Sequence, residues 1–358
     1  MRASGFLWLG LLGLVCVAGC SSGGGSGSDE KRVIILTNGN SPFWDACRVG
    51  LQEADKDIKL KDAGLRAVLE VNDGTPKGQL DKLRQYASVG DVAALGISAL
   101  DATNAAVADQ LRELQKKGIK VVTIDSDVDR GQMRDARFAF VGTDNLAGGR
   151  ELGKCAKGIR PTGGEYVTFV GRKAAQNAVE RIGGFAEGAG DKFKAADSMI
   201  DNIDLTKARE NVRNAVTNHP DLKVLVGIWS YNAPAIVDVV KEKNVRDQYT
   251  IVTFDAEPIA IEEMGKGLID AMVVQNPHEM GYQGVRLMKA LVKDDQATIK
   301  EMLPNLGKTD GDVYDTGLKV VIPDEGSPLK PEMFDKKTKV LKLSEFKAWL
   351  KDKNLTGS

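Results

Sequence analysis

The stretch from Lys31 to Trp44, KRVIILTNGNSPFW, decides the fold that the rest of the chain is expected to follow. Its first part, residues 33–36 (VIIL), is the continuous apolar run that a parallel strand buried on both faces requires. Turn-forming residues come next. Pro42 then suits the first turn of a helix, where its missing N–H group is not needed. The stretch therefore predicts a buried strand, a tight loop and a helix in immediate succession.

The loop of this unit carries side chains suited to holding a small molecule. Ligands of open α/β sheets bind just beyond the carboxyl ends of the strands. Asn40 and Ser41 offer hydrogen-bonding groups there, and Phe43 and Trp44 offer two flat apolar faces. The alternative interpretation is that both aromatics are ordinary core residues, because aromatic side chains contribute strongly to cores.

The composition argues against several classes of protein. With 358 residues the chain is long enough for two domains, and 42% hydrophobic with 28% charged residues is typical of a globular protein. A net charge of −1 gives no reason to expect a nucleic-acid partner. The two histidines, His219 and His278, supply little for histidine catalysis or a multi-histidine metal site. We therefore expect no metal ion, no cofactor and no catalytic residue.

The N-terminus has the features of an export signal. A positively charged residue precedes an apolar run over residues 6–17, which is shorter than the roughly 20 residues of a membrane-spanning helix. The sequence VAGC at residues 17–20 then resembles the lipobox of bacterial lipoproteins. We expect residues 1–20 to be a lipoprotein signal peptide, Cys20 to carry the lipid, and residues 21–30 to be a flexible Gly/Ser tether. The protein would then be exported and lipid-anchored to a membrane, in the periplasm or on the cell surface; the alternative is an ordinary cleaved signal with a chance cysteine.

Short β-branched runs alternate with amphipathic segments along the body, which is the pattern of parallel strands covered by helices on both faces. Strands are expected at residues 33–36, 67–71, 92–97, 120–124, 138–141, 165–170, 195–202, 224–228, 250–254 and 271–274. Helices are expected between them, and a last one at residues 343–353. The series of strand–helix units ends near residue 142 and then begins again, which predicts two similar α/β lobes.

Polar and aromatic side chains gather at the expected carboxyl ends of these strands. The candidate ligand-binding residues are Asn40, Ser41, Phe43, Trp44, Asp73, Ser98, Asp125, Asn177, Trp229, Asn232, Asp255 and Gln275. Carboxylates, amides and hydroxyls can hydrogen-bond the hydroxyl groups of a sugar, and aromatic rings can stack on its apolar faces. Any one of them could instead be an ordinary strand-end or capping residue. Asp125 and Asp255, however, each directly follow an apolar strand, one in each half of the chain.

Over residues 31–322 the sequence resembles the periplasmic sugar-binding proteins of the ribose-binding type, which are solute-binding components of ABC importers. The motifs that carry the resemblance are NSPFW (40–44), VVTIDSD (121–127), GTDNLAGG (142–149), AQNAVERIGGF (175–185), WSYNAPA (229–235), IVTFDAEP (251–258) and VVQNP (273–277). Each motif alone is weak, but their order and spacing are specific to this family.

The resemblance implies the α/β fold of type I periplasmic binding proteins, in which two Rossmann-like lobes with parallel sheets are joined by three hinge crossovers and the ligand lies between the lobes. The crossovers are expected near residues 142–144, 275–277 and 314–317. The expected division is residues 31–142 and 277–315 for the N-terminal lobe, 143–276 and 316–345 for the C-terminal lobe, and 346–358 for a C-terminal tail.

Several candidate residues correspond to ligand-binding positions of that family. By the resemblance, Phe43 and Trp44 match its pair of stacking aromatics. Asp125 and Asp255 match its two acidic ligands, and Gln275 matches a glutamine at the hinge. These five positions are where the resemblance and the strand-end pattern agree.

Other positions depart from the family. Ser126 stands where an arginine is usual, and near the second ligand arginine this chain has Asn177 and Val179. By the resemblance, Arg181 matches a different arginine, which we interpret as structural. Because a planar guanidinium group is not replaced by Ser or Val, ribose is not the expected ligand. The additional indole of Trp229 fits a larger or less polar polyol.

Two further cysteines, Cys47 and Cys155, belong to the expected body of the protein. They could pair in an oxidising compartment. Because they fall in different expected lobes, we favour two buried free thiols, which is a common state of cysteine.

The sequence thus predicts a monomeric extracytoplasmic solute-binding lipoprotein, not an enzyme, that captures a small sugar or polyol between two lobes and delivers it to the permease of an ABC importer. A lipoprotein that senses its ligand for a membrane receptor is an open alternative. A carbohydrate-active enzyme that uses Asp125 and Asp255 is a further one, although no nucleophile–base pairing accompanies them. A repressor of the same fold would need a DNA-binding domain where this chain has its export signal.

Overall fold

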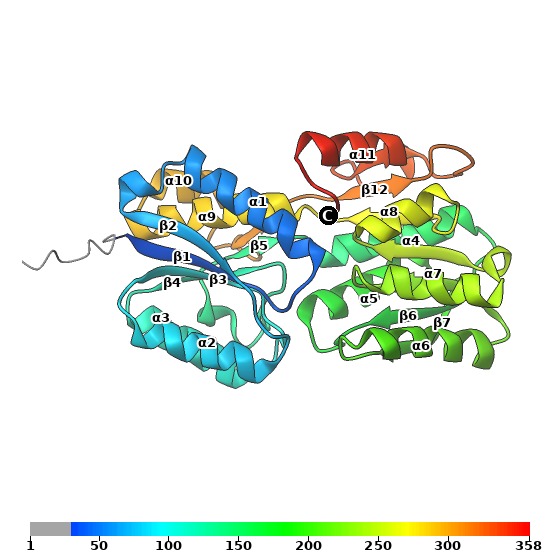
Figure 1. The fold of residues 1–358 in the computed structure, drawn as a ribbon, viewed down its shortest axis with the longest axis horizontal. Helices are drawn as coiled ribbons and strands as arrows, with labels where there is room; N and C mark the ends of the chain where they lie inside the picture. The colour runs from blue at the N-terminus through cyan, green and yellow to red at the C-terminus, as the bar shows by residue number, and fades with distance from the viewer. Residues whose placement is uncertain (1–29) are drawn as a thin grey trace, which may run out of the picture.

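The computed structural model describes residues 30–358, so the predicted signal peptide, Cys20 and nearly all of the predicted tether lie outside the described residues. The described chain forms two α/β lobes that lie side by side (Figure 1). The prediction of two lobes built on largely parallel sheets is confirmed. Among residues 30–358, none of the helices is both long and apolar enough to cross a membrane.

The first lobe is built on a six-stranded sheet in the order β11-β5-β4-β3-β1-β2. Its strands are β1 (Lys31–Leu36), β2 (Leu65–Glu70), β3 (Val92–Ile97), β4 (Lys120–Ile124), β5 (Phe140–Gly142) and β11 (Val313–Asp315). All neighbouring pairs in this sheet are parallel. One face is covered by α1 (Pro42–Asp57), α9 (Pro277–Lys293) and α10 (Gln296–Met302). The other face is covered by α2 (Pro76–Ser88) and α3 (Ala105–Lys116).

The second lobe is built on a seven-stranded sheet in the order β13-β12-β10-β9-β8-β6-β7. Its strands are β6 (Gly164–Val170), β7 (Phe193–Ile200), β8 (Leu222–Gly227), β9 (Thr250–Phe254), β10 (Ala271–Val274), β12 (Lys319–Ile322) and β13 (Lys339–Lys342). All neighbouring pairs are parallel except β10 with β12. One face is covered by α4 (Asn145–Ile159) and α5 (Gln176–Ala189). The other is covered by α6 (Leu205–Asn218), α7 (Asn232–Lys243), α8 (Pro258–Gly265) and α11 (Leu343–Asp352).

The chain passes between the two sheets three times, from β5 into α4, from β10 into α9 and from β11 into β12. These passages fall where the sequence placed the crossovers. The strands β11, β12 and β13 were not predicted as separate strands. β11 and β13 are end strands of their sheets and only partly buried, so their sequences lack the continuous apolar run of an inner strand.

The C-terminal part of the chain is integrated into the second lobe. Phe346 and Leu350 of α11 are buried in the core of that lobe, although the sequence analysis assigned residues 346–358 to a separate tail. Cys47 and Cys155 are free thiols buried in the cores of different lobes, as predicted.

Helices α4 and α5 pack against each other through glycines. A Cβ atom on Gly149 of α4 would lie 2.3 Å from the backbone oxygen of Arg181. A Cβ atom on Gly184 of α5 would lie 2.3 Å from the backbone oxygen of Leu146. Since no real Cβ atom approaches so closely, the absence of side chains here lets the two helices touch, and this contact fixes the position of α5 on the sheet.

Two adjacent glycines of α5 provide a test of this packing. Gly184→Ala should lower the free energy of unfolding by about 1–3 kcal/mol, because the methyl group forces the two helices apart. Gly183→Ala should leave it unchanged or raise it by about 0.5–1 kcal/mol, because Gly183 faces open space within a helix. Urea unfolding of both variants measures the difference; equal stabilities would contradict the close contact between α4 and α5.

Candidate ligand-binding site

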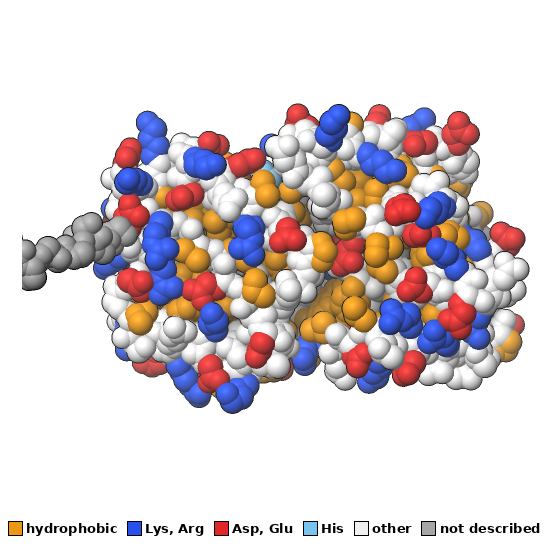
Figure 2. Space-filling model, viewed as in Figure 1, with side chains coloured by type: hydrophobic (Ala, Val, Ile, Leu, Met, Phe, Trp, Pro, Cys, Tyr) orange, Lys and Arg blue, Asp and Glu red, His pale blue; other side chains and the backbone are white. Residues whose placement is uncertain are grey.

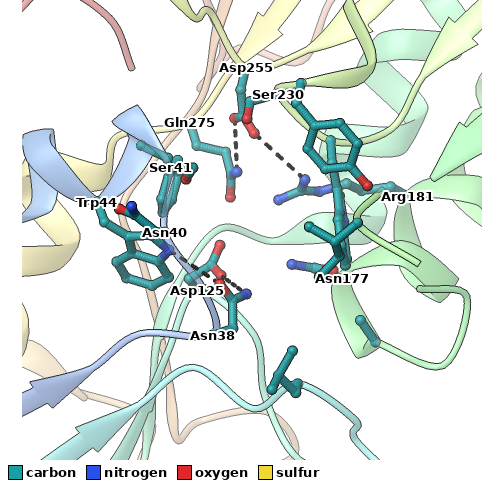
Figure 3. Close-up of a pocket in the computed structure, with 17 residues that line it drawn as sticks. Asn38, Asn40, Ser41, Trp44, Asp125, Asn177, Arg181, Ser230, Asp255 and Gln275 are labelled. Atoms are coloured by element: carbon teal, nitrogen blue, oxygen red, sulfur yellow. Dashed lines mark hydrogen bonds and ion pairs between the residues drawn. The ribbon is translucent and has the colours of Figure 1, made fainter. Parts of the chain in front are cut away.

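A cavity of about 100 Å³ lies between the two lobes. The space-filling view shows a groove at this boundary with hydrophobic side chains along it (Figure 2). The lining residues follow strands of both sheets or lie in the first two turns of the helices after them (Figure 3). They are Asn38, Gly39, Asn40, Ser41, Phe43, Trp44, Leu100, Asp125, Ala175, Asn177, Arg181, Ile203, Trp229, Ser230, Tyr231, Asp255 and Gln275.

Asp125 is the carboxylate that the first lobe contributes. It directly follows β4, and its backbone adopts the left-handed conformation (φ 66°), which Asp tolerates better than most residues. Its side chain is buried and accepts a hydrogen bond from Ser98 Oγ at 2.9 Å and one from Asn38 Nδ2 at 3.5 Å. Burial raises the pKa of Asp125, while Arg181 and Ser98 oppose the rise. The carboxylate therefore has acceptor capacity that the protein does not fully use.

Asp255 is its counterpart in the second lobe. It directly follows β9, and its backbone is again left-handed (φ 64°). Gln275 Nε2 donates a hydrogen bond to Asp255 Oδ1 at 2.9 Å, and Arg181 Nη1 lies 3.9 Å from Asp255 Oδ2 (Figure 3). Burial raises the pKa of Asp255 to about 6, although the Arg181 charge and the Gln275 hydrogen bond act in the opposite direction.

Arg181 brings a positive charge into the same cavity. Its Nε donates to Asn145 Oδ1 at 2.9 Å, its Nη1 donates to the backbone oxygen of Ile228 at 3.1 Å, and its guanidinium lies over the ring of Phe254. The side chain is 1% exposed, and its Nη2 has no hydrogen-bond partner among the described residues. A buried, unused donor in the wall of a cavity is free to bind an oxygen atom of a ligand.

Sequence reasoning placed Arg181 at a structural position, whereas the structure places it in the cavity wall. The signal that could have found it is helical spacing. Asn177, a candidate from the sequence, lies four residues earlier on α5, and residues four apart in a helix share one face.

Aromatic rings form the apolar part of the wall. Phe43 and Trp44 pack edge to face, with ring centroids 5.1 Å apart. Trp44 Nε1 donates to Asn38 Oδ1 at 3.2 Å, and Trp229 Nε1 donates to Asn177 Oδ1 at 3.2 Å. Each indole is thus oriented by an amide. Phe43 and Trp44 line the cavity and are also part of the first lobe's core, and their contact with a ligand stays a prediction.

The structure brings nine of the twelve candidates from the sequence into the cavity wall and leaves Asp73, Ser98 and Asn232 outside it. Asp73 is exposed and accepts hydrogen bonds from the backbone and hydroxyl of Thr75, just before α2. Ser98 is buried behind Asp125 and donates to it. Asn232 is buried and accepts from the backbone N–H of Trp229. Ser98 and Asn232 therefore position cavity residues.

Other lining residues were not among the sequence candidates. Asn38 and Ser230 add polar groups, and Ile203 adds an apolar one. Tyr231 turns its hydroxyl away to Asp201, which accepts this hydrogen bond at 2.6 Å. Within residues 30–358, no group of three or more His, Cys, Asp or Glu side chains is placed to hold a metal ion. The cavity combines acceptors, donors that include the buried Arg181 Nη2, and flat apolar faces, which suits a small polyhydroxylated molecule.

Two such lobes with a polar cavity between them define a binding protein that encloses its ligand. Residues 32–296 match the family model described as the periplasmic binding protein domain, and the chain belongs to this family of exported binding proteins.

The chain is similar to the ribose import binding protein RbsB of Salmonella typhimurium, with 24% identity over 81% of this chain and 94% of that protein. It is also similar in fold to an ABC transporter solute-binding protein from Burkholderia graminis solved in complex with D-arabinose, with a TM-score of 0.71, 23% identity, and coverage of 83% of this chain and 96% of that one. A third similar structure is the XylFII–LytSN complex, with a TM-score of 0.67, 23% identity, and coverage of 74% and 94%. The resemblance to the ribose-binding type is confirmed.

The raised pKa of Asp255 predicts a pH dependence of stability in the ligand-free protein. The folded state holds the proton of Asp255 up to about pH 6, whereas an ordinary aspartate loses it near 3.8. Because the folded state binds this proton more tightly, the free energy of unfolding should fall as the pH rises from about 4 to about 6, by up to about 3 kcal/mol from this group. Asp255→Asn should remove that part of the fall.

Urea unfolding of both proteins across this pH range measures the effect. Groups that do not interact with Asp255 titrate equally in the two proteins, so the difference between their curves reports Asp255 together with the Asp125 carboxylate that is coupled to it. Two curves that stay parallel from pH 4 to pH 6 would show that Asp255 titrates normally in the folded state.

Proposed function

We propose that this chain is the solute-binding component of an ABC importer and that it captures a small neutral sugar or polyol between its lobes. The observation that carries the proposal is the pair of buried carboxylates, Asp125 from the first lobe and Asp255 from the second, in one cavity with the unpartnered Nη2 of Arg181.

The hydrogen-bonding groups of the cavity complement those of a sugar. Hydroxyl groups of a sugar donate to carboxylates, and such charge-assisted hydrogen bonds are stronger than neutral ones. A ring oxygen or hydroxyl oxygen accepts from Arg181 Nη2. The apolar C–H faces of the sugar pack on aromatic rings such as Trp229. A purely apolar ligand would leave these hydrogen-bonding groups unused, and the sugars named for RbsB and for the Burkholderia graminis protein support the sugar class.

Binding by both lobes also explains how the ligand would act on the protein. A ligand shifts a conformational equilibrium only by binding one state better than the other. A sugar that bonds Asp125 and Asp255 at once makes its full set of contacts only when the lobes are closed. The three crossovers serve as the hinge, and the closed form is the one that the permease recognises.

The proposal predicts that the wild-type protein binds a sugar and that substitution of a cavity carboxylate weakens this binding. In a thermal-shift screen of pentoses, hexoses, polyols, nucleosides and amino acids, a sugar or polyol should raise the melting temperature, because a ligand that binds only the folded state stabilises it. Asp125→Asn should weaken binding of that sugar by about 10- to 100-fold, since a buried charged hydrogen-bond acceptor is lost. Asp73→Ala should bind as wild type does, because Asp73 lies outside the cavity.

Titration calorimetry of the three proteins gives the affinities. A response confined to nucleosides or amino acids would overturn the sugar proposal. Equal affinity of wild type and Asp125→Asn would show that the ligand is bound elsewhere.

A sensor is the second candidate function. It is favoured by the XylFII–LytSN complex, which shows a protein of this fold in complex with a partner protein. The Asp125→Asn variant separates the two roles in cells. Loss of uptake of the sugar found by the screen indicates an importer component; unchanged uptake with a lost transcriptional response to that sugar indicates a sensor.

We further propose that the protein is anchored to the membrane by a lipid on Cys20, on the strength of the VAGC sequence that ends an apolar run. Cells grown with labelled palmitate should incorporate label into the wild-type protein and not into Cys20→Ser. Label in neither protein would favour an ordinary cleaved signal.

A further inference from the structure

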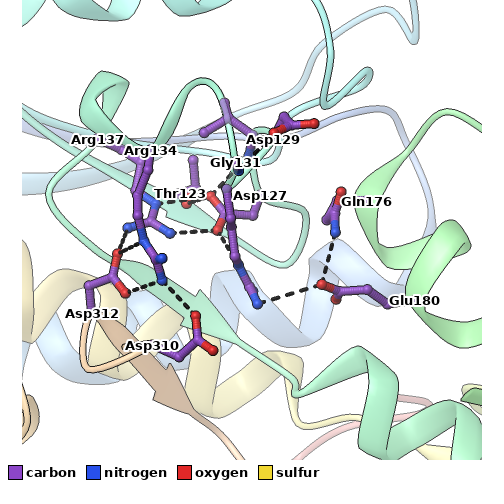
Figure 4. A network of polar contacts seen from close by, with 12 residues as sticks. Thr123, Asp127, Asp129, Gly131, Arg134, Arg137, Gln176, Glu180, Asp310 and Asp312 are labelled. Carbon is purple, nitrogen blue, oxygen red and sulfur yellow. Dashed lines mark hydrogen bonds and ion pairs between the residues drawn. The ribbon is translucent and has the colours of Figure 1, made fainter. Parts of the chain in front are cut away.

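An ion pair joins the two lobes outside the ligand cavity. Arg130 lies in the loop after β4 of the first lobe, and Glu180 lies on α5 of the second. Arg130 Nη1 is 3.5 Å from Glu180 Oε1, and the side chains are 22% and 16% exposed (Figure 4). Since the two residues belong to different lobes, movement of one lobe relative to the other acts on this pair.

The first-lobe member of this pair is held in place by its own lobe. Arg130 Nε donates to Asp127 Oδ2 at 2.9 Å, and its guanidinium lies over the ring of Phe140. Asp127 is buried and also accepts from Thr123 Oγ at 2.6 Å and from Arg137 Nε and Nη2 at 3.0 and 2.7 Å. This anchoring directs Arg130 Nη1 at the second lobe.

The same network reaches the start of β11. Arg137, which is fully buried, also pairs with Asp312, and Arg134 donates two hydrogen bonds to Asp312 at 2.9 and 2.8 Å (Figure 4). Asp312 directly precedes β11, the strand from which the chain crosses to the second lobe. Arg130 is therefore tied through ion pairs to the start of β11, the strand whose other end leads into a crossover.

Glu180, the second-lobe member of the pair, is also held by a residue of its own lobe. Gln176 Nε2 donates to Glu180 Oε1 at 2.9 Å, one helical turn away. Burial raises the pKa of Glu180, Arg130 opposes the rise, and the more distant carboxylates of Asp144 and Asp127 add to it. Arg130 is thus the cation, supplied by the other lobe, that faces this partly buried carboxylate.

We propose that Arg130 and Glu180 form a latch that holds the lobes closed over the ligand and slows its release without touching it. The latch rests on the proposed function, because it needs a ligand enclosed between the lobes. Both residues are positioning residues. Glu180 directly precedes Arg181 on α5. The latch therefore acts on the helix that carries this residue of the cavity wall.

The test uses the full-length protein and the sugar identified by the thermal-shift screen. Glu180→Gln keeps the shape of the side chain and removes its charge. Dissociation of the sugar, followed by tryptophan fluorescence in stopped flow, should become roughly three- to tenfold faster, which is the range expected for loss of one partly exposed ion pair. The melting temperature of the ligand-free protein should stay unchanged, because the latch is absent from the open form.

Two further measurements separate a latch from a merely structural role. The double variant Arg130→Gln/Glu180→Gln should release the sugar no faster than the faster of the two single variants. Both substitutions remove the same interaction, so their effects should not add. The control is Glu242→Gln, which removes an exposed ion pair with Arg213 inside the second lobe and should leave dissociation at the wild-type rate.

The outcomes are distinct. Wild-type dissociation in Glu180→Gln, additive effects of the two substitutions, or a ligand-free melting temperature that falls as far as that of the complex would each overturn the latch while leaving sugar binding intact. A wild-type protein that binds no sugar would overturn the proposed function, and the latch with it.

Discussion

The incomplete neutralisation of three buried charges is the constraint on which this structure depends. Asp125, Asp255 and Arg181 enter one cavity, and each is almost fully removed from water. Burial of an ion costs several kcal/mol unless partners replace the lost water. The protein supplies some of these partners, Ser98 for Asp125 and Gln275 for Asp255. The remaining hydrogen-bonding capacity faces the cavity, where a polyhydroxylated ligand would complete it.

The two lobes place their carboxylates in the same way, at the carboxyl end of an inner strand. Asp125 and Asp255 each directly follow an inner parallel strand, and both have a left-handed backbone, with φ values of 66° and 64°. The carboxyl ends of parallel strands all lie at one edge of a sheet, so each lobe can present its acid at the boundary. Because each lobe holds only one of the two acids, neither lobe alone forms the cavity. Helix α5, held against α4 by glycine contacts, adds Arg181 to the second lobe's share.

The two lobes and both carboxylates could be predicted from the sequence, because a buried parallel strand leaves an unbroken apolar run and an aspartate directly after it stands out. Whether the loop after a strand turns its side chain into the cavity could not be predicted. Asp73 also comes soon after a strand, yet it is exposed and bonds Thr75 at the start of α2. Arg181 was assigned a structural role, although its spacing of four residues from Asn177 puts both on one face of α5. The end strands β11 and β13 were missed because they are short and only partly buried.

A crystal structure of residues 30–358 with the sugar that gives the largest thermal shift tests the central claim most directly. The account predicts closed lobes, sugar hydroxyls within hydrogen-bonding distance of both Asp125 and Asp255, and a sugar oxygen bound to Arg181 Nη2. A sugar bound outside the cavity, or one that contacts the residues of a single lobe, would contradict it.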